Sequence, residues 1–281
     1  MIGSRRPVAS VLLLPSLALL VLLFYVPQLL MFLVSLGRRT AYGGVAREAS
    51  PDNYLRALEP LYLAILGRSL VLATVTTLLC LLVGYPVAWW LARRAPARWR
   101  NALLALVILP FWTSFLVRMY AWIVLLRSEG VVNLALQAAG LSRADLLYND
   151  FAVLVGQLYG ELPFMIIPLY VSLEKLDSSL LEAAADLGAD ARRTFTRVVV
   201  PQTMPGIVAG CVLVFIPSLG AYLAPDLLGG GKTAYVGNLI QSQFAVARDT
   251  PFGAALSFVL SLVVVLLLLV FRRPLRSAQA L

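Results

Sequence analysis

The stretch EAAADLGADARRTFTRVVVP, residues 182–201, is the longest polar interruption in the second half of a very apolar chain. It opens with Glu182 and three alanines, has Gly188 six positions later, and ends at Pro201. Glycine adopts the left-handed conformation that ends many helices, and proline, which has no backbone N–H, interrupts or restarts a helix. The pattern therefore predicts a short helix, a glycine bend and a second short helix directly before an apolar segment.

Two helix caps are predicted around this bend. Ser179 and Glu182 have the spacing of a capping box, in which the serine hydroxyl accepts a backbone hydrogen bond and the glutamate reaches back to the cap. Asp190 follows the bend and is expected to cap the second helix, because its short side chain can accept from the first free N–H groups. The alanines after Glu182 leave a smooth surface that another protein can approach closely.

The composition outside this stretch is that of a membrane protein with several spans. The chain has 281 residues, of which 60% are hydrophobic and 13% are charged, and soluble domains are less apolar. The net charge of +9 comes from basic residues at the ends of apolar segments, which argues against nucleic-acid binding and for membrane flanks. There is no histidine, which excludes histidine general bases and histidine metal ligands. Cys80 and Cys211 lie inside apolar runs and are expected to be packing residues.

The predicted fold class is all-α, with six transmembrane helices in a single domain of residues 1–281. The first apolar run could be a signal peptide, but it is uncharged over 31 residues, which is too long for one. Pro110 interrupts the third run and Pro86 is expected to kink the second. The six spans are expected at about residues 10–36, 68–92, 101–126, 151–173, 202–224 and 251–271.

The charge pattern predicts an orientation. The segments assigned to the inside hold 13 basic and five acidic residues, and those assigned to the outside hold nine basic and eight acidic residues. By the positive-inside rule, both termini and the loop at residues 177–201 are cytoplasmic.

This loop resembles the EAA loop of the membrane subunits of bacterial ABC importers. The pattern of Glu-Ala-Ala, three residues, Gly, nine residues, two spaced aliphatic residues and Pro is filled at every position, with Val198 and Val200 as the aliphatic pair. The resemblance implies a coupling helix that sits in a groove of a cytoplasmic ATPase subunit. The alternative is an ordinary amphipathic helix between two spans. The residues expected to couple to the ATPase are Glu182, Ala183, Ala184, Gly188 and Pro201.

A glycine-rich segment, Gly-Gly-Gly-Lys-Thr at residues 229–233, looks like the end of a phosphate-binding loop. That pattern needs a glycine five positions before Gly231, where this chain has Asp226, and no strand is predicted before it. We therefore expect no catalysis and no nucleotide, cofactor or metal site in this chain. A flexible gate or a receptor-contact loop is the preferred interpretation.

Two ionisable residues, Arg118 and Glu161, fall within predicted spans. Such groups usually face a bundle interior or a water-filled cavity. They could pair with each other, or Arg118 could extend to the interface. Alternatively, Glu161 attracts a cationic solute in a translocation pathway, with Asp226 as a second carboxylate. Aromatic rings also attract ammonium groups. The aromatic candidates for this pathway are Trp112, Tyr159 and Tyr222.

A broader resemblance covers about residues 50–272. The segments LPFWTSFLVRMYAW, LPFMIIPLY, LEKLDSSLLEAAADLGA, VPQTMPGIVAG and APDLLGGGK look like those of the spermidine/putrescine importer permeases, specifically the first of their two membrane subunits. The resemblance implies the type I ABC importer permease fold, a place in the bacterial inner membrane and a polyamine substrate. It implies three partners besides membrane lipid: a second related permease, a cytoplasmic ATPase dimer that binds ATP and Mg²⁺, and an extracytoplasmic binding protein.

Several alternatives stay open from the sequence. The family has apolar residues where this chain has Glu161, so the same machinery could import another solute, such as an opine-like compound, ferric ion or another organic cation. A stand-alone channel or secondary carrier would need more membrane-embedded charges or an internal repeat. A membrane-embedded enzyme would need a nucleophile with a base, or a metal cluster.

Overall fold

The protein is described by a computed structural model that covers residues 14–40, 44–46 and 49–278, with side chains up to Leu269. The chain divides into two compact units. The first comprises residues 1–63 and 239–261, and the second comprises residues 64–238 and 262–281.

The first unit begins with a helix at Leu14–Ser35 that is long and apolar enough to cross a membrane. Residues 10–13 of the predicted first span lie outside the described residues. The helix includes a π-helical stretch, η1 (Val21–Tyr25), followed by α2 (Val26–Ser35). A two-stranded antiparallel hairpin follows, and then a short helix. These elements are β1 (Arg38–Arg39), β2 (Val45–Ala46) and α3 (Asp52–Ala57).

Polar side chains of α3 hold this unit together. The amide of Asn53 donates to the backbone oxygens of Ser35 and Gly37 at 2.9 and 2.8 Å, and so satisfies carbonyls at the end of α2. Arg56 donates to the carboxylate of Asp249 at 2.9 Å, and its guanidinium lies 3.9 Å from the centre of the Phe252 ring. Asp249 in turn accepts from the backbone N–H of Phe252, at the start of α14 (Thr250–Ala278). The buried carboxylate is thus fully paired.

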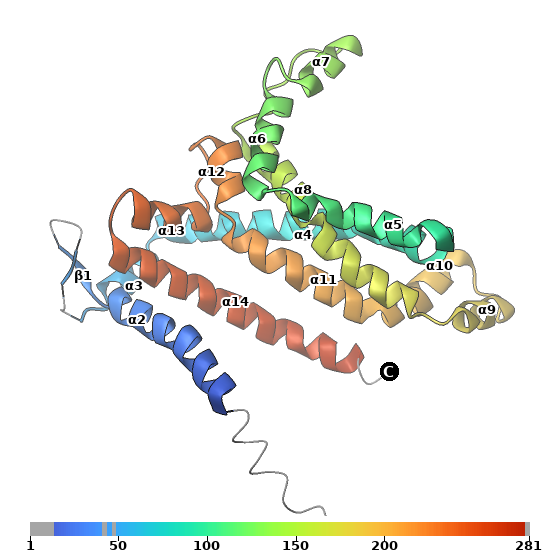
Figure 1. Ribbon diagram of the computed structural model, residues 1–281, viewed down its shortest axis with the longest axis horizontal. Helices are drawn as coiled ribbons and strands as arrows, with labels where there is room; N and C mark the ends of the chain where they lie inside the picture. Colours follow the sequence, from blue (N-terminus) through green and yellow to red (C-terminus); the bar gives the residue numbers. More distant parts are fainter. Residues whose placement is uncertain (1–13, 41–43, 47–48, 279–281) are drawn as a thin grey trace, which may run out of the picture. The chain divides into compact units, whose positions relative to one another are not determined.

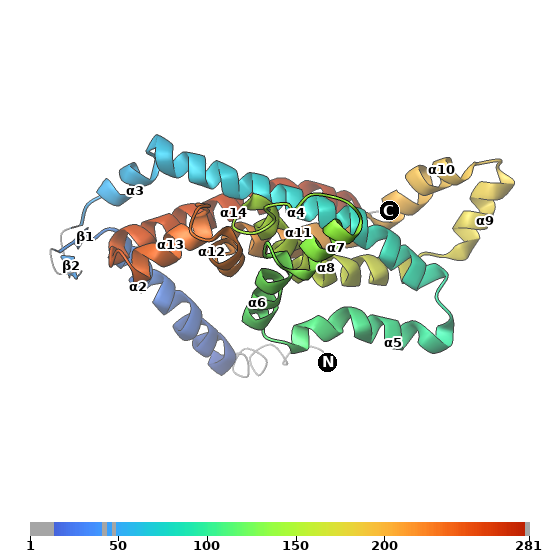
Figure 2. The same ribbon diagram turned by 90° about the horizontal axis from the view of Figure 1, so that it is seen from above.

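In the second unit, α4, α8 and α11 pack side by side around one apolar core (Figures 1 and 2). Small residues permit this approach, because Gly84 of α4 and Gly210 of α11 both face Met165 of α8. The helices from α4 to α13 are α4 (Pro60–Arg93), α5 (Ala97–Ile108), η2 (Leu109–Trp112), α6 (Phe115–Leu126), α7 (Val131–Ala138), α8 (Asp150–Glu174), α9 (Ser178–Asp186), α10 (Ala191–Thr194), η3 (Phe195–Val199), α11 (Val200–Gly220), α12 (Leu223–Gly229) and α13 (Val236–Ala245).

The predicted third span, residues 101–126, is not one helix. The chain bends by 91° between Ala97–Trp112 and Phe115–Ala138. Pro110 is the second residue of a 3₁₀ turn that begins at Leu109, and Thr113 is extended with ψ of 145°, so the backbone turns before α6 begins. Within the described residues, five helices are long and apolar enough to cross a membrane, and the count reaches six if the bent pair is one span.

Other spans also have different ends from those predicted, and the helix of the sixth continues past position 271 to Ala278. The second begins at Pro60, eight residues before position 68, and continues through Pro86 to Arg93. The fifth ends at Gly220, four residues before position 224, because Ala221 is extended and a new helix, α12, starts at Leu223. Tyr222 therefore lies in a connection between two helices and not at the end of a span.

Candidate functional site

The segment at residues 177–201 begins with a helix, α9, whose cap differs from the predicted one. The carboxylate of Asp177 accepts from the backbone N–H of Ser179 at 2.9 Å. The predicted capping box from Ser179 to Glu182 is wrong, because the helix already begins at Ser178 and Ser179 is inside it. The hydrogen bond from the Ser179 backbone N–H lowers the pKa of Asp177, with smaller help from the side chain of Ser179 and the charge of Arg93. The cap is therefore ionised at neutral pH.

The glycine bend is confirmed. Gly188 has φ of 76°, in the left-handed region. Its N–H donates to the oxygen of Ala185, and the N–H of Ala189 donates to the oxygen of Ala184, both at 2.9 Å. This pair of bonds is the Schellman arrangement that closes a helix end. The predicted second cap is also confirmed, because Asp190 accepts from the backbone N–H of Arg193 at 2.7 Å.

The outer face of α9 is accessible. Glu182 and Ala183 are exposed, whereas Ala184 is buried. Two leucines are also exposed, Leu180 in the helix and Leu187, which is 88% exposed, at its end. The segment thus presents small and apolar side chains that another protein could contact. That it contacts an ATPase stays a prediction.

The spans hold this segment at both of its ends. Arg93 of α4 donates to the backbone oxygen of Leu176. At the other end, the ring of Tyr85 lies edge-on to Phe195, 5.5 Å between ring centres, and its hydroxyl lies 3.0 Å from that of Thr203. Pro201 is the second residue of α11 and follows the π-helical stretch η3. The two ends of this segment are therefore in contact with α4 and α11.

The membrane-embedded charges are not paired with each other. Within the described residues no ion pair of 4.0 Å or less joins Arg118 to Glu161. Instead, the guanidinium of Arg118 lies between three aromatic rings, 5.2 Å from the centre of Phe115, 5.8 Å from Tyr159 and 5.9 Å from Phe111. Two of its nitrogens and one oxygen of Glu161 are buried without a hydrogen-bond partner. Of the alternatives left open by the sequence, a direct ion pair between Arg118 and Glu161 is not formed in this structure.

The other predicted pathway residues lie apart from these charges. Trp112 is 87% exposed at the bend between α5 and α6. Tyr222 and Asp226 are exposed at the start of α12. No hydrogen bond, ion pair or ring contact joins any of these three to Glu161 in the part of the chain that the structure describes. Of the predicted set, only Arg118 and Tyr159 are in contact.

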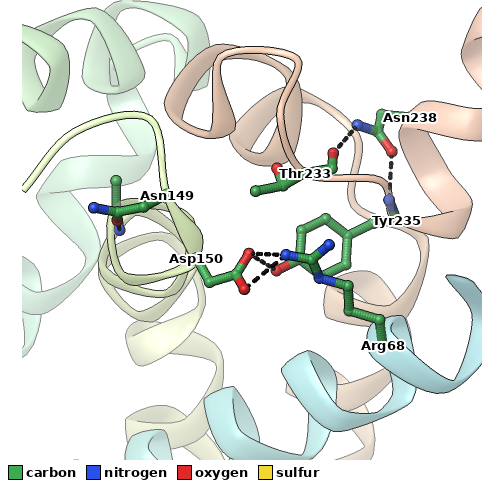
Figure 3. Close-up of polar contacts among 7 residues, drawn as sticks. Arg68, Asn149, Asp150, Thr233, Tyr235 and Asn238 are labelled. Carbon is green, nitrogen blue, oxygen red and sulfur yellow. Dashed lines mark hydrogen bonds and ion pairs between the residues drawn. The ribbon is translucent and has the colours of Figure 1, made fainter.

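A polar cluster at the other end of α8 was not predicted (Figure 3). Arg68 of α4 donates to both carboxylate oxygens of Asp150, each at 2.7 Å, and the hydroxyl of Tyr235 donates to the same carboxylate at 2.8 Å. The guanidinium of Arg68 also lies 5.2 Å from the Tyr235 ring centre. Burial, with the hydrogen bond to Asp150, raises the pKa of Tyr235 to about 12, so its hydroxyl stays a donor at neutral pH.

Further contacts fasten the glycine-rich segment to this cluster. Asn238 accepts from the backbone N–H of Tyr235 and donates to the oxygen of Thr233, at 2.8 and 2.9 Å (Figure 3). The N–H of Val236 donates to the hydroxyl of Ser69 in α4 at 2.8 Å, and this bond is buried. The segment after the glycines is thus tied to the first turn of α8 and to α4. In the sequence, the only indication of this cluster is that Arg68 and Asp150 each stand at the end of an apolar run.

Comparison with known proteins defines the class. Residues 84–275 match the family described as "Binding-protein-dependent transport system inner membrane component". The chain therefore belongs to this family of inner membrane transport components. It is a multi-pass permease subunit of an ABC importer, a class in which a separate subunit hydrolyses ATP.

Individual relatives whose names give a substrate match most of the chain. The chain is 45% identical over 259 residues to the spermidine/putrescine transport system permease protein PotB of Escherichia coli (strain K12), which covers 92% of this chain and 94% of that protein. It is 43% identical over 256 residues to the protein of the same name from Haemophilus influenzae, covering 90% and 89%.

A solved structure shows the same fold. It is the crystal structure of a bacterial ABC transporter involved in the import of the acidic polysaccharide alginate, with a TM-score of 0.75, 17% identity, and coverage of 97% of this chain and 96% of that chain. The type I permease fold is confirmed, and the fold alone does not determine the solute.

Proposed function

We propose that this chain is one of two related membrane subunits of an importer for the polyamines spermidine and putrescine. The observation that carries the proposal is the 45% identity over 92% of the chain to a permease with that substrate. The inferred partners are the second permease, a cytoplasmic ATPase dimer, an extracytoplasmic binding protein and membrane lipid. The charge asymmetry supports cytoplasmic termini and a cytoplasmic segment at residues 177–201.

Coupling is proposed to run through α9. ATP and Mg²⁺ bind to the partner ATPase, whose closure moves the docked α9 as a body. The exposed residues Glu182 and Ala183 and the closed helix end at Gly188 support this role. The contacts of Arg93 and Tyr85 with either end of the segment supply the mechanical link to α4 and α11. Coupling then needs contacts that differ between two states of the transporter.

The pathway is proposed to include Glu161. A buried carboxylate oxygen without a partner is costly, so it marks a functional site at membrane depth. Arg118 contacts three aromatic rings and forms no ion pair with Glu161 within the described residues, so this carboxylate can accept an ammonium group of the solute. Trp112, Tyr222 and Asp226 are proposed to line outer parts of the path. The unpaired Glu161 also favours a second candidate, another organic cation carried by the same machinery.

The test uses the complete transporter in nanodiscs. The chain is purified with its neighbouring subunits, and ATPase activity is measured with binding protein loaded with spermidine, putrescine or other solutes. Stimulation by polyamine-loaded binding protein is expected. If the ATPase co-purifies but polyamines have no effect, the polyamine proposal fails and the importer class stands. Isolation of an intact chain without an ATPase would contradict the coupling role.

A further inference from the structure

We infer that a basic pocket beside the N-terminal end of α8 receives a carboxylate side chain of the extracytoplasmic binding protein. The inference rests on the proposed function, since it names the surface that this partner would contact. The cavity measures about 640 Å³. Its lining includes Arg127, Ser128, Asp145, Tyr148, Asn149 and Lys232.

One buried amide fixes the spacing of two walls. Asn133 of α7 is 1% exposed. Its nitrogen donates to the backbone oxygens of Arg127 and Ala144, both at 3.1 Å, and its oxygen accepts from the N–H of Ala144 at 2.9 Å. A fully satisfied buried amide holds its partners in one geometry. Arg127 and the loop at Ala144 therefore keep a constant separation across the pocket.

The remaining walls are also constrained. Asn149 donates to the backbone oxygen of Asp145 at 2.7 Å and accepts from the N–H of Ala152, so it caps α8 and shapes the loop at once. Tyr148 has φ of 61°, a left-handed conformation that few residues other than glycine adopt. Its ring lies against Gly230, which is two residues before Lys232, a residue that also lines the pocket. The pocket is thus formed before any partner arrives, which lowers the cost of binding.

The charges of the pocket select the partner's chemistry. Arg127 and Lys232 are exposed and form no ion pair within the described residues, and Asp145 is the single acidic residue of the lining. The pocket is therefore net positive, with further donors in Ser128 and Asn149. A polyammonium solute is repelled by this charge, whereas a carboxylate is attracted.

The position of the pocket agrees with this partner. It lies where α8 begins, and α9 lies just past the other end of α8, a helix of 25 residues that is about 37 Å long. That length is enough to span a membrane. When α9 faces a cytoplasmic ATPase, the pocket opens on the opposite side, where the binding protein is found.

Charge reversal in the complete transporter tests the inference. The variants are Arg127→Glu and Lys232→Glu, and the measurement is the concentration of loaded binding protein that gives half-maximal ATPase stimulation. We expect this concentration to rise at least about tenfold for either variant, with a weaker dependence on salt, while the maximal stimulated rate changes by less than about twofold. Arg143→Glu is the matched control. Arg143 is exposed on the connection between α7 and α8, which contributes residues to the pocket, but it does not itself line the pocket.

Three results would overturn the inference. The first is an unchanged half-maximal concentration in both variants, and the second is an equal rise in Arg143→Glu, which would indicate general steering by charge. The third is a change in the dependence on polyamine concentration with unchanged binding-protein affinity, which would make the pocket part of the solute path. If a glutamate variant fails to assemble, Arg127→Gln and Lys232→Gln give the same test. Failure of the proposed function is distinguishable, because the unmodified transporter would then not respond to polyamine-loaded binding protein.

Discussion

The two ends of α8 use their polar groups in opposite ways. At the C-terminal end, the hydrogen bonds of the segment at residues 177–201 are local, between groups two to five residues apart, as in the caps at Asp177 and Asp190. At the N-terminal end, Asp150 bonds to Arg68 and Tyr235, which are 82 and 85 residues away. The first end, from Asp177 onward, is closed on itself except at its borders, where Arg93 bonds to Leu176 and Tyr85 contacts Phe195. The second end is tied to two other parts of the chain.

This difference indicates different mechanical roles. A segment with internal caps keeps its shape when its position changes, so it can move as a rigid body with a partner. A cluster that joins α4, α8 and the chain before α13 keeps its shape only while all three stay in place. We therefore expect changes at the first end to impair coupling and changes at the second end to loosen the structure locally.

The largest effect is expected from Gly188→Val. No atom lies within 4 Å of a Cβ at this position, so the cost is backbone strain at φ of 76°, about 1 to 3 kcal/mol. Such a cost corresponds to about five- to hundredfold in a docking equilibrium. Polyamine uptake by cells that depend on this transporter should fall in that range, while the amount of the chain in the membrane is unchanged.

A second glycine supplies the control for strain. Gly140 also has a left-handed φ, 78°, and open space around a Cβ. Gly140→Val should therefore impose similar strain without a comparable loss of uptake, and Gly188→Asn should keep most activity because asparagine tolerates this conformation. Equal loss in both valine variants would remove the contrast between the two ends.

A smaller effect, on local stability, is expected from Asp150→Ala. It removes the ion pair with Arg68 and the hydrogen bond from Tyr235, which together contribute about 1 to 2 kcal/mol because both charged groups are partly exposed. Amide hydrogen exchange should speed up in residues 229–238, while α9 is unaffected. Equal acceleration in α9 would show that the two ends are not independent.

The structure of residues 177–201, after the C-terminal end of α8, could be predicted from the sequence because it depends on neighbouring residues. The bend at Gly188 and the cap at Asp190 follow from residues within one or two turns, and both are confirmed. The first cap was misplaced by two residues, since Asp177 and Ser179 both fit the rule for a cap and only the actual helix start decides between them.

The contacts at the N-terminal end of α8 could not be predicted from the sequence. Pairing of Arg68 with Asp150 depends on how α4 and α8 pack, and nothing in a single sequence links positions 82 residues apart. The bend in the third span shows an intermediate case. Pro110 marked the place of the interruption, but the 91° angle depends on the extended backbone at Thr113.

A moderate effect on stimulated ATPase activity is expected from Asp190→Ala, in the segment at residues 177–201. Loss of the bond to the backbone N–H of Arg193 should cost about 1 kcal/mol of the stability of α10, or about fivefold in an equilibrium that needs the folded segment. Stimulated ATPase activity should fall by up to that factor. Asp190→Asn should retain nearly full activity, because asparagine is an equally good cap. A loss in the asparagine variant would mean that the charge, and not the cap, matters.

The smallest effect is expected from Tyr235→Phe. This change removes only the hydrogen bond from Tyr235 to Asp150, at the N-terminal end of α8. Asp150 keeps Arg68, so exchange in residues 229–238 should accelerate only by about two- to tenfold. Because burial raises the pKa of Tyr235 to about 12 from 10.0, the bond is complete below the unfolded value and is lost only as pH rises through the folded one. The ratio of exchange rates between variant and wild type should therefore stay constant from about pH 6 to about pH 9. A ratio that falls towards one within this range would mean that the hydroxyl ionises near neutral pH, and that the cluster is a weaker tie than its geometry indicates.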